Sequence, residues 1–338
     1  MKSEMALVDE IRAACERVAD RARWVSIDEG RLKSYASELP LSSGRPVLDP
    51  DAYFLDGSEE KRAAFVLTFN AINFGSGWWP TIRKRPGRSG SYTVLMGLKE
   101  RFDAHGPWSP EELIAIEPGE IATVLGQDPD HELMVLFADA LRDLGVRLHE
   151  EYAGRYLALV EAANGSAVAL AERLARWPSF ADVSVYDGEP GPFFKRAQIT
   201  SADLVHAGAA EFDDLERLTL FTDNLIPHVL RVDGVLRYDA KLVAWIDGEQ
   251  LLEHGSPEEV EIRACVVYAV ELMGSTRGDT TAQEVDYLLW TAAKSPITRH
   301  DRGIGSGRRH TEEGLALEAP KTNPCGPCLM AIAPKSFL

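Results

Sequence analysis

The recurrence of apolar residues at alternating steps of three and four constrains this 338-residue chain more than any other feature. The segments 8–22 and 133–148 both follow this spacing, and Tyr152 and Leu157 continue the second one. Such spacing lines one face of an α-helix with apolar side chains. We therefore predict a helix in each segment and a fold built mainly of helices.

Three helix starts are marked by a hydroxyl residue with Glu three positions later, at 109–112, 256–259 and 281–284. In this capping box each of the two side chains accepts a hydrogen bond from a backbone N–H that the first helical turn leaves unpaired. Proline follows the serine in two of the boxes, where its missing N–H costs nothing. The boxes predict helices that begin near 110 and that run over 257–273 and 282–293, with Gly126 and Gly274 as stops.

Strand signals are sparse. Val183, Val185 and Phe193 flank the turn-rich segment 187–192, which predicts one small β-hairpin. The segment 229–245 reads as a helix, a tight turn at Gly234 and a second helix. We expect a mainly α protein with at most a small β-hairpin. Its single helical domain spans 1–302, and a divergent C-terminal tail spans 303–338.

Charge narrows the range of ligands. The chain carries 36 Lys and Arg against 53 Asp and Glu, for a formal net charge of -17. Proteins that bind nucleic acid polymers usually need a basic surface that displaces counterions from phosphates. We therefore expect no nucleic acid polymer as a partner, whereas a pocket with a few cations can still bind a small anion.

The chain has neither an apolar run of the roughly 20 residues needed to cross a bilayer nor a basic-then-apolar secretory start. We expect a cytoplasmic monomer with no membrane partner. Cys15 and Cys265 lie in apolar helical patterns typical of buried, inert thiols. Cys325 and Cys328 have the spacing of a redox pair, but their flanks favour a loose tail without that function.

Aromatic and basic residues mark two candidate binding segments. Between Asn73 and Pro80, three large aromatic residues surround two glycines, which suits a wall against a flat heterocycle or a plug of the core. Lys195 and Arg196 enter a predicted helix, where cations beside free N–H groups suit a phosphate, although a solvated face is the commoner role.

Acidic residues mark two more segments. Asp223 follows an apolar stretch and precedes Pro227, so it lies at a turn, either as a helix cap or as a carboxylate facing a cleft. Asp286 borders the apolar stripe of a predicted helix and shares one face with Trp290. It either lines a pocket or favours the positive end of the helix dipole.

Taken together, these segments resemble the queuosine-salvage protein family. The resemblance is carried by five motifs in the same order: NF…WW-P, FKRAQI, FTDN-x-x-P, EVEIR and DY-x-x-W, at 73–80, 194–199, 221–227, 259–263 and 286–290. It covers roughly residues 5 to 293 and decays beyond Ser295.

The resemblance implies a helical fold related to helix-hairpin-helix DNA glycosylases. It implies hydrolysis of queuosine 5'-phosphate to queuine and ribose 5-phosphate, with no metal and no cofactor, and with Asp223 as the catalytic carboxylate. The expected substrate-binding residues are Tyr53, Asn73, Phe74, Trp78, Trp79, Lys195, Arg196, Phe221, Thr222, Asp286, Tyr287 and Thr291.

The chemistry of this substrate suits a carboxylate. Queuine is a 7-deazapurine, so its five-membered ring has no basic N7 for an acid to protonate, and more of the barrier must be lowered on the sugar side. A fixed anion beside the anomeric carbon stabilises the oxocarbenium-like state of glycosidic cleavage. Two alternatives remain: a non-catalytic protein that binds queuine or another nucleobase, and a glycosylase for another modified nucleoside.

Overall fold

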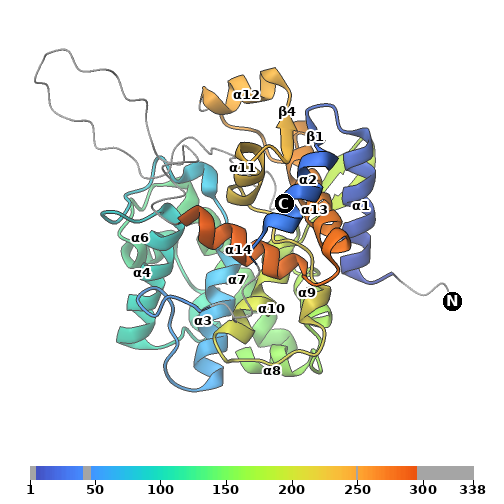
Figure 1. The fold of residues 1–338 in the computed structure, drawn as a ribbon. Helices are drawn as coiled ribbons and strands as arrows, with labels where there is room; N and C mark the ends of the chain where they lie inside the picture. The colour runs from blue at the N-terminus through green and yellow to red at the C-terminus, as the bar shows by residue number, and fades with distance from the viewer. Residues whose placement is uncertain (1–4, 41–46, 249, 295–338) are drawn as a thin grey trace, which may run out of the picture.

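The computed structural model describes residues 5–40, 47–248 and 250–294, and helices dominate them (Figure 1). The fourteen α-helices of this described part are α1 (Leu7–Arg21), α2 (Glu29–Glu38), α3 (Glu59–Ala71), α4 (Gly90–His105), α5 (Pro110–Ile114), α6 (Pro118–Leu125), α7 (Glu132–Tyr152), α8 (Tyr156–Glu161), α9 (Ala167–Leu174), α10 (Lys195–His206), α11 (Leu225–Val232), α12 (Ala240–Asp247), α13 (Pro257–Arg277) and α14 (Ala282–Lys294). Short 3-10 helices lie at η1 (Ser76–Trp78), η2 (Pro178–Phe180) and η3 (Leu215–Arg217). The mainly helical fold is confirmed.

The core has two helical centres. α13 packs against α1 and α2, and it is buried on most of its sides from Val260 to Met273. α3 packs against α10, α7 and α8, and all its residues from Ala63 to Ala71 are buried. α14 contacts both α11 and α13, and in Figure 1 the orange-red α14 runs across the middle of the molecule.

The predicted helix starts are confirmed, with one difference. The boxes of Ser109 and Thr281 are complete, with hydrogen bonds made in both directions. At the start of α13, Ser256 Oγ accepts from Glu259 N, but the carboxylate of Glu259 accepts from Gly255 N and contacts Arg263 instead of returning to Ser256. The buried arginine draws the glutamate away from its local partner.

The helix ends were harder to predict. Gly126 ends α6 in the left-handed conformation, as expected. α13 continues past Gly274 and ends at Gly278, whose N–H donates to the carbonyl of Gly274. The helix begun at Pro110 ends already at Ile114. α7 ends at Tyr152, so Leu157 belongs to the separate helix α8.

The prediction of at most one β-hairpin was wrong. The expected hairpin is present as β2 (Val183–Tyr186) and β3 (Glu189–Pro192), which pair antiparallel. A second two-stranded sheet pairs β1 (Val25–Ile27) with β4 (Leu236–Tyr238), so β4 interrupts the predicted helix over 236–245. Three-residue strands are too short to show a two-residue period, and their pairing joins segments far apart in the chain.

Glu261 of α13 holds this second sheet in place. Its Oε2 accepts hydrogen bonds from the backbone N–H groups of Arg23, Trp24 and Val25, at 2.8, 2.6 and 3.1 Å. A fully buried carboxylate therefore satisfies the backbone that enters β1. This sheet pairs a segment near the N-terminus with residues 236–238, and Glu261 of α13 fixes its first strand.

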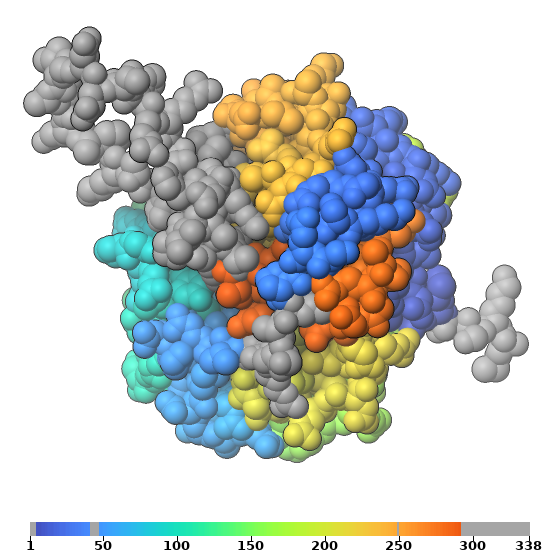
Figure 2. All heavy atoms as spheres, in the orientation of Figure 1, coloured from blue at the N-terminus to red at the C-terminus, as the bar shows by residue number. Residues whose placement is uncertain are grey.

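The molecular surface shows where the packed helices α13 and α14 reach the exterior. In Figure 2 the orange surface of α13 and α14 lies near the centre of the visible face, between blue N-terminal and yellow segments. None of the helices in the described part of the chain combines the length and apolar composition needed to cross a bilayer.

Candidate active site

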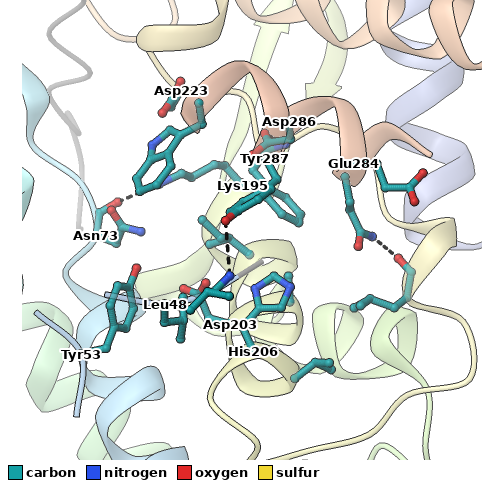
Figure 3. A pocket seen from close by; sticks show the side chains of 18 of the residues that line it. Leu48, Tyr53, Asn73, Lys195, Asp203, His206, Asp223, Glu284, Asp286 and Tyr287 are labelled. Atoms are coloured by element: carbon teal, nitrogen blue, oxygen red, sulfur yellow. Dashed lines mark hydrogen bonds between the residues drawn. The ribbon is translucent and has the colours of Figure 1, made fainter. Parts of the chain in front are cut away.

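A cavity of about 700 Å³ lies between α10, α14, the end of α3 and the segment that precedes α11 (Figure 3). Its wall is aromatic and acidic. Its lining includes Asp49, Tyr53, Phe69, Asn73, Tyr92, Lys195, Ile199, Asp203, His206, Glu216, Phe221, Asp223, Glu284, Asp286, Tyr287 and Trp290.

A smaller cavity of about 150 Å³ adjoins the first. Its wall is richer in basic side chains, because Lys195, Arg196, Arg263 and His254 all line it. Four residues, Asn73, Ser91, Lys195 and Asp223, line both cavities. The two cavities therefore meet where Lys195 and Asp223 lie.

Asp223 acts as a helix cap and faces the cavities at the same time. It follows the buried Thr222 and precedes α11, and its Oδ1 accepts from Leu225 N at 2.8 Å and Ile226 N at 3.2 Å. These two hydrogen bonds fix the side chain at the positive end of the α11 dipole. Its Oδ2 makes no hydrogen bond to the described residues. The two interpretations of Asp223 as a cap and as a cleft residue are thus compatible.

α10 supplies one wall of the large cavity. Lys195, Ile199, Asp203 and His206 follow one another at three- and four-residue steps, so they share a face of the helix. The chain enters this helix through Phe194, a non-glycine residue in the left-handed conformation with φ 49°. Lys195 Nζ donates to the carbonyl of Asn73 at 3.4 Å.

The start of α10 is held from α13. Arg263 makes two parallel hydrogen bonds to Asp182, at 2.8 and 2.7 Å, and its guanidinium lies 3.9 Å from the Phe193 ring centroid. Asp182 Oδ2 also accepts from Lys195 N at 3.1 Å. Burial opposes ionisation of Asp182, but the adjacent Arg263 prevails and lowers the pKa to about 2.

Arg196 is committed to the protein. Its Nη1 donates to the carbonyl of Ala71 at 2.6 Å, and its guanidinium lies over the rings of Phe74 and Phe180, at 4.7 and 5.5 Å. Burial lowers the pKa of Arg196 to about 10. The guanidinium of Arg196 is therefore engaged mainly with the protein, and its role at the small cavity is to form part of the wall.

α14 supplies the opposite wall of the large cavity. Asp286 Oδ1 accepts from Phe221 N at 3.2 Å, which joins this helix to the segment before Asp223. Burial, and after it the negative charge of Asp223, raises the pKa of Asp286 well above its usual range. The hydroxyl of Tyr287 accepts from Val47 N at 3.3 Å.

The structure brings most of the predicted site residues together. Around the large cavity lie Tyr53, Asn73, Lys195, Phe221, Asp223, Asp286 and Tyr287, and around the small one lie Asn73, Phe74, Trp79, Lys195, Arg196, Thr222 and Asp223. Trp78 and Thr291 are not among the described residues that line either cavity. The indole N–H of Trp78 donates instead to Glu132 at 3.2 Å, and Thr291 is exposed.

Several residues that line the two cavities were not predicted from the sequence. Asp49, Asp203, Asp182 and His254 belong to this group. Arg263, the last residue of the EVEIR motif, pairs with Glu259 and also reaches the small cavity. The helical spacing of Asp203 from Lys195 was the one available signal. Among the described residues, no three His, Cys, Asp or Glu side chains form a group that could hold a metal ion.

Two joined cavities with aromatic walls and a few converging charged groups have the features of the small-molecule sites of enzymes and binding proteins. A model of the queuosine salvage protein family matches residues 53–308. The chain belongs to this family.

Curated relatives match over most of the chain. The chain is 34% identical over 288 residues to the queuosine 5'-phosphate N-glycosylase/hydrolase of Sphaerobacter thermophilus, covering 81% of this chain and 89% of the relative. It is 27% identical over 316 residues to the protein of the same name from Bos taurus, covering 84% and 92%. The Dictyostelium discoideum protein of that name is 30% identical over 252 residues, covering 71% and 75%.

Proposed function

We propose that this protein is a hydrolase that splits queuosine 5'-phosphate into queuine and ribose 5-phosphate. One observation carries the proposal: the carboxylate of Asp223 lies where an acidic, aromatic cavity meets a small basic one. A nucleotide with a cationic base needs both chambers, and its glycosidic bond falls between them. The names and coverage of the relatives support the same substrate.

The base occupies the large cavity in this proposal. Tyr53, Phe221 and Tyr287 offer ring surfaces for a flat heterocycle. Asp286 accepts hydrogen bonds from the N–H donors on the pairing edge of the base. A site built on such acceptors discriminates against ligands that lack the donors, because its own buried groups then stay unpaired.

The 5'-phosphate occupies the small cavity. Lys195 reaches it from the first position of α10, and Arg263 and His254 line the same wall. Arg196, already bonded to the carbonyl of Ala71, contributes positive charge at longer range. Cations around a small, partly closed chamber favour a dianionic group.

Asp223 stabilises the sugar as the bond breaks. The bond between the anomeric carbon and the base nitrogen cleaves, its electron pair stays on the base, and positive charge develops on the ribose ring. A water oxygen then bonds to the anomeric carbon, and a proton from this water ends on the base nitrogen. The carboxylate either stabilises the cation directly or activates this water.

The test is incubation with queuosine 5'-phosphate and chromatography for free queuine. We expect release by the wild-type protein and a loss of roughly 1000-fold or more in kcat for Asp223→Asn, by analogy with the removal of other electrostatic catalysts. Asparagine keeps an oxygen acceptor for the N–H groups of Leu225 and Ile226, so α11 stays capped. Near-wild-type turnover by this variant would falsify the role of Asp223, and queuine binding without release would indicate a binding protein.

We further propose that the fold is related to helix-hairpin-helix DNA glycosylases. α11, the left-handed Gly234 and α12 support this relation, although β4 lies between the turn and the second helix. The protein acts in the cytoplasm as a monomer on the free nucleotide, because a net charge of -17 disfavours tRNA as a substrate. The domain boundary at 302 and the tail 303–338, with Cys325 and Cys328, lie outside the described residues.

A further inference from the structure

The large cavity is lined by more acidic side chains than the proposed reaction requires. Its described lining includes six carboxylates: Asp49, Asp203, Glu216, Asp223, Glu284 and Asp286. Lys195 is the one Lys or Arg among these lining residues, and its ammonium has no carboxylate of the described residues within 4 Å. A neutral heterocycle would leave this surplus uncompensated.

Asp203 is the most deeply placed of the six. It is 6% exposed, whereas Glu216 and Glu284 are exposed and the other three are half-buried. Its Oδ2 accepts from Asn70 Nδ2 at 2.9 Å, and Asn70 is itself fully buried. Its Oδ1 has no hydrogen-bond partner among the described residues, and in Figure 3 the side chain lies at the side of the cavity opposite Asp223.

Burial of this carboxylate without an ionic partner is unfavourable. A neutral amide replaces only part of the hydration that the anion loses. Burial accordingly raises the pKa of Asp203 to about 6, against the hydrogen bond from Asn70. Asn70 Oδ1 in turn accepts from Asn73 Nδ2 at 3.0 Å, so a buried amide chain holds the carboxylate in one orientation.

α10 orders the groups along the substrate. Lys195 begins the helix beside the small cavity, and Asp203 follows eight residues later on the same face, about 12 Å further along the axis. Ile199 lies between them as an apolar surface. A nucleotide whose phosphate is near Lys195 and whose sugar is near Asp223 therefore points its base substituent toward Asp203.

We infer that Asp203 is a specificity-determining residue that binds the cationic amine carried by the base of the substrate. This inference rests on the proposed function for the identity of the base. A substrate ammonium would supply the positive charge that this carboxylate is missing as a partner, and it would donate a hydrogen bond to Oδ1. The protein thereby distinguishes an aminoalkylated 7-deazaguanine from the unsubstituted base, which offers the same ring and the same pairing edge.

The test compares two nucleotides and two variants. The nucleotides are queuosine 5'-phosphate and 7-deazaguanosine 5'-phosphate, which lacks the cationic aminoalkyl substituent. The variants are Asp203→Asn, which removes the charge but keeps the shape, and Asp56→Asn as the matched control at an exposed position that lines neither cavity. We expect D203N to lower kcat/KM for the aminoalkylated substrate by roughly 30-fold or more, mainly through KM. Its kcat/KM for the unsubstituted substrate stays within about twofold, and D56N retains the wild-type preference.

Two further measurements separate the possible failures. Calorimetry with queuine and 7-deazaguanine measures binding, so it tests the role of Asp203 even if the wild-type protein releases no base. Failure to release base would contradict the proposed hydrolase activity and leave the inference on Asp203 to the binding data. If D203N does not fold, binding of N-acetylated queuine, whose side-chain amine is neutral, is measured with the wild-type protein instead. We expect the wild-type protein to bind N-acetylated queuine as weakly as it binds 7-deazaguanine. Equal losses on both nucleotides in D203N, or tight binding of the acetylated base, would overturn the inference.

Discussion

At the scale of single residues, Lys195 places its ammonium at the junction of the two cavities. Its pKa is lowered by burial, and the negative charge of Asp223 opposes that shift. Among the described residues, its ammonium donates a hydrogen bond to the carbonyl of Asn73. An ammonium with so few partners at the junction of two cavities is available to an anionic ligand, and a bound phosphate would favour its charged form.

We therefore predict that Lys195→Met acts mainly on the phosphate. KM for queuosine 5'-phosphate should rise roughly 10- to 100-fold, whereas kcat/KM for unphosphorylated queuosine should change by about threefold or less. Steady-state kinetics with both substrates measures this difference. Lys241→Met, an exposed position on α12, is the control. An equal loss on both substrates would contradict the assignment.

At the scale of elements, the junction of α13 with α10 depends on the Arg263–Asp182 pair. Both side chains are largely buried, at 2% and 15% exposure, and Asp182 also receives the first N–H of α10. Removing one partner of such a pair leaves the other as an uncompensated buried charge. The position of Lys195 thus depends on a residue 68 positions further along the chain.

Arg263→Met should lower the free energy of unfolding by about 3–5 kcal/mol. The double variant Asp182→Asn with Arg263→Met should recover part of this loss, because it removes the stranded carboxylate as well. Urea denaturation followed by circular dichroism measures both values. Equal stabilities of the two variants would show that the carboxylate of Asp182 is solvated after the arginine is removed.

At the scale of the whole molecule, two buried carboxylates give stability opposite dependences on pH. The pKa of Asp203 is raised to about 6 and that of Asp182 is lowered to about 2, from 3.8 for both. Between about pH 4 and 6 the folded protein therefore holds an extra proton on Asp203, so its stability falls as pH rises. Below about pH 4 the unfolded chain protonates Asp182 first, so stability is lost as pH falls toward 2.

We predict a maximum of the unfolding free energy near pH 4 to 5 from these two groups. The gain on acidification from pH 7 to 5 should be about 1–2 kcal/mol. Asp203→Asn should reduce this upper limb, to which the raised pKa of Asp286 also contributes, and Asp182→Asn should reduce the acid limb. Thermal unfolding between pH 3 and 8 at constant ionic strength measures both. An upper limb that is unchanged in D203N would assign it to other groups.

Local patterns in the sequence predicted most of the helices because capping and amphipathic spacing act over three or four residues. Ser109, Thr281 and Gly126 perform the roles that their neighbours imply. The motif around Asp223 likewise predicted a turn residue that caps the following helix, because both hydrogen bonds of this cap are made to adjacent residues.

Only the tertiary structure decided the rest. The pairing of Val25 with Tyr238 and that of Arg263 with Asp182 join groups that the local pattern does not connect. Asp203 reads in the sequence as an ordinary helical residue, and it becomes a binding candidate because α14 and α3 close a cavity over its face. Hydrogen bonding within one turn is encoded locally, whereas the desolvation and charge that make a site arise from segments brought together by packing.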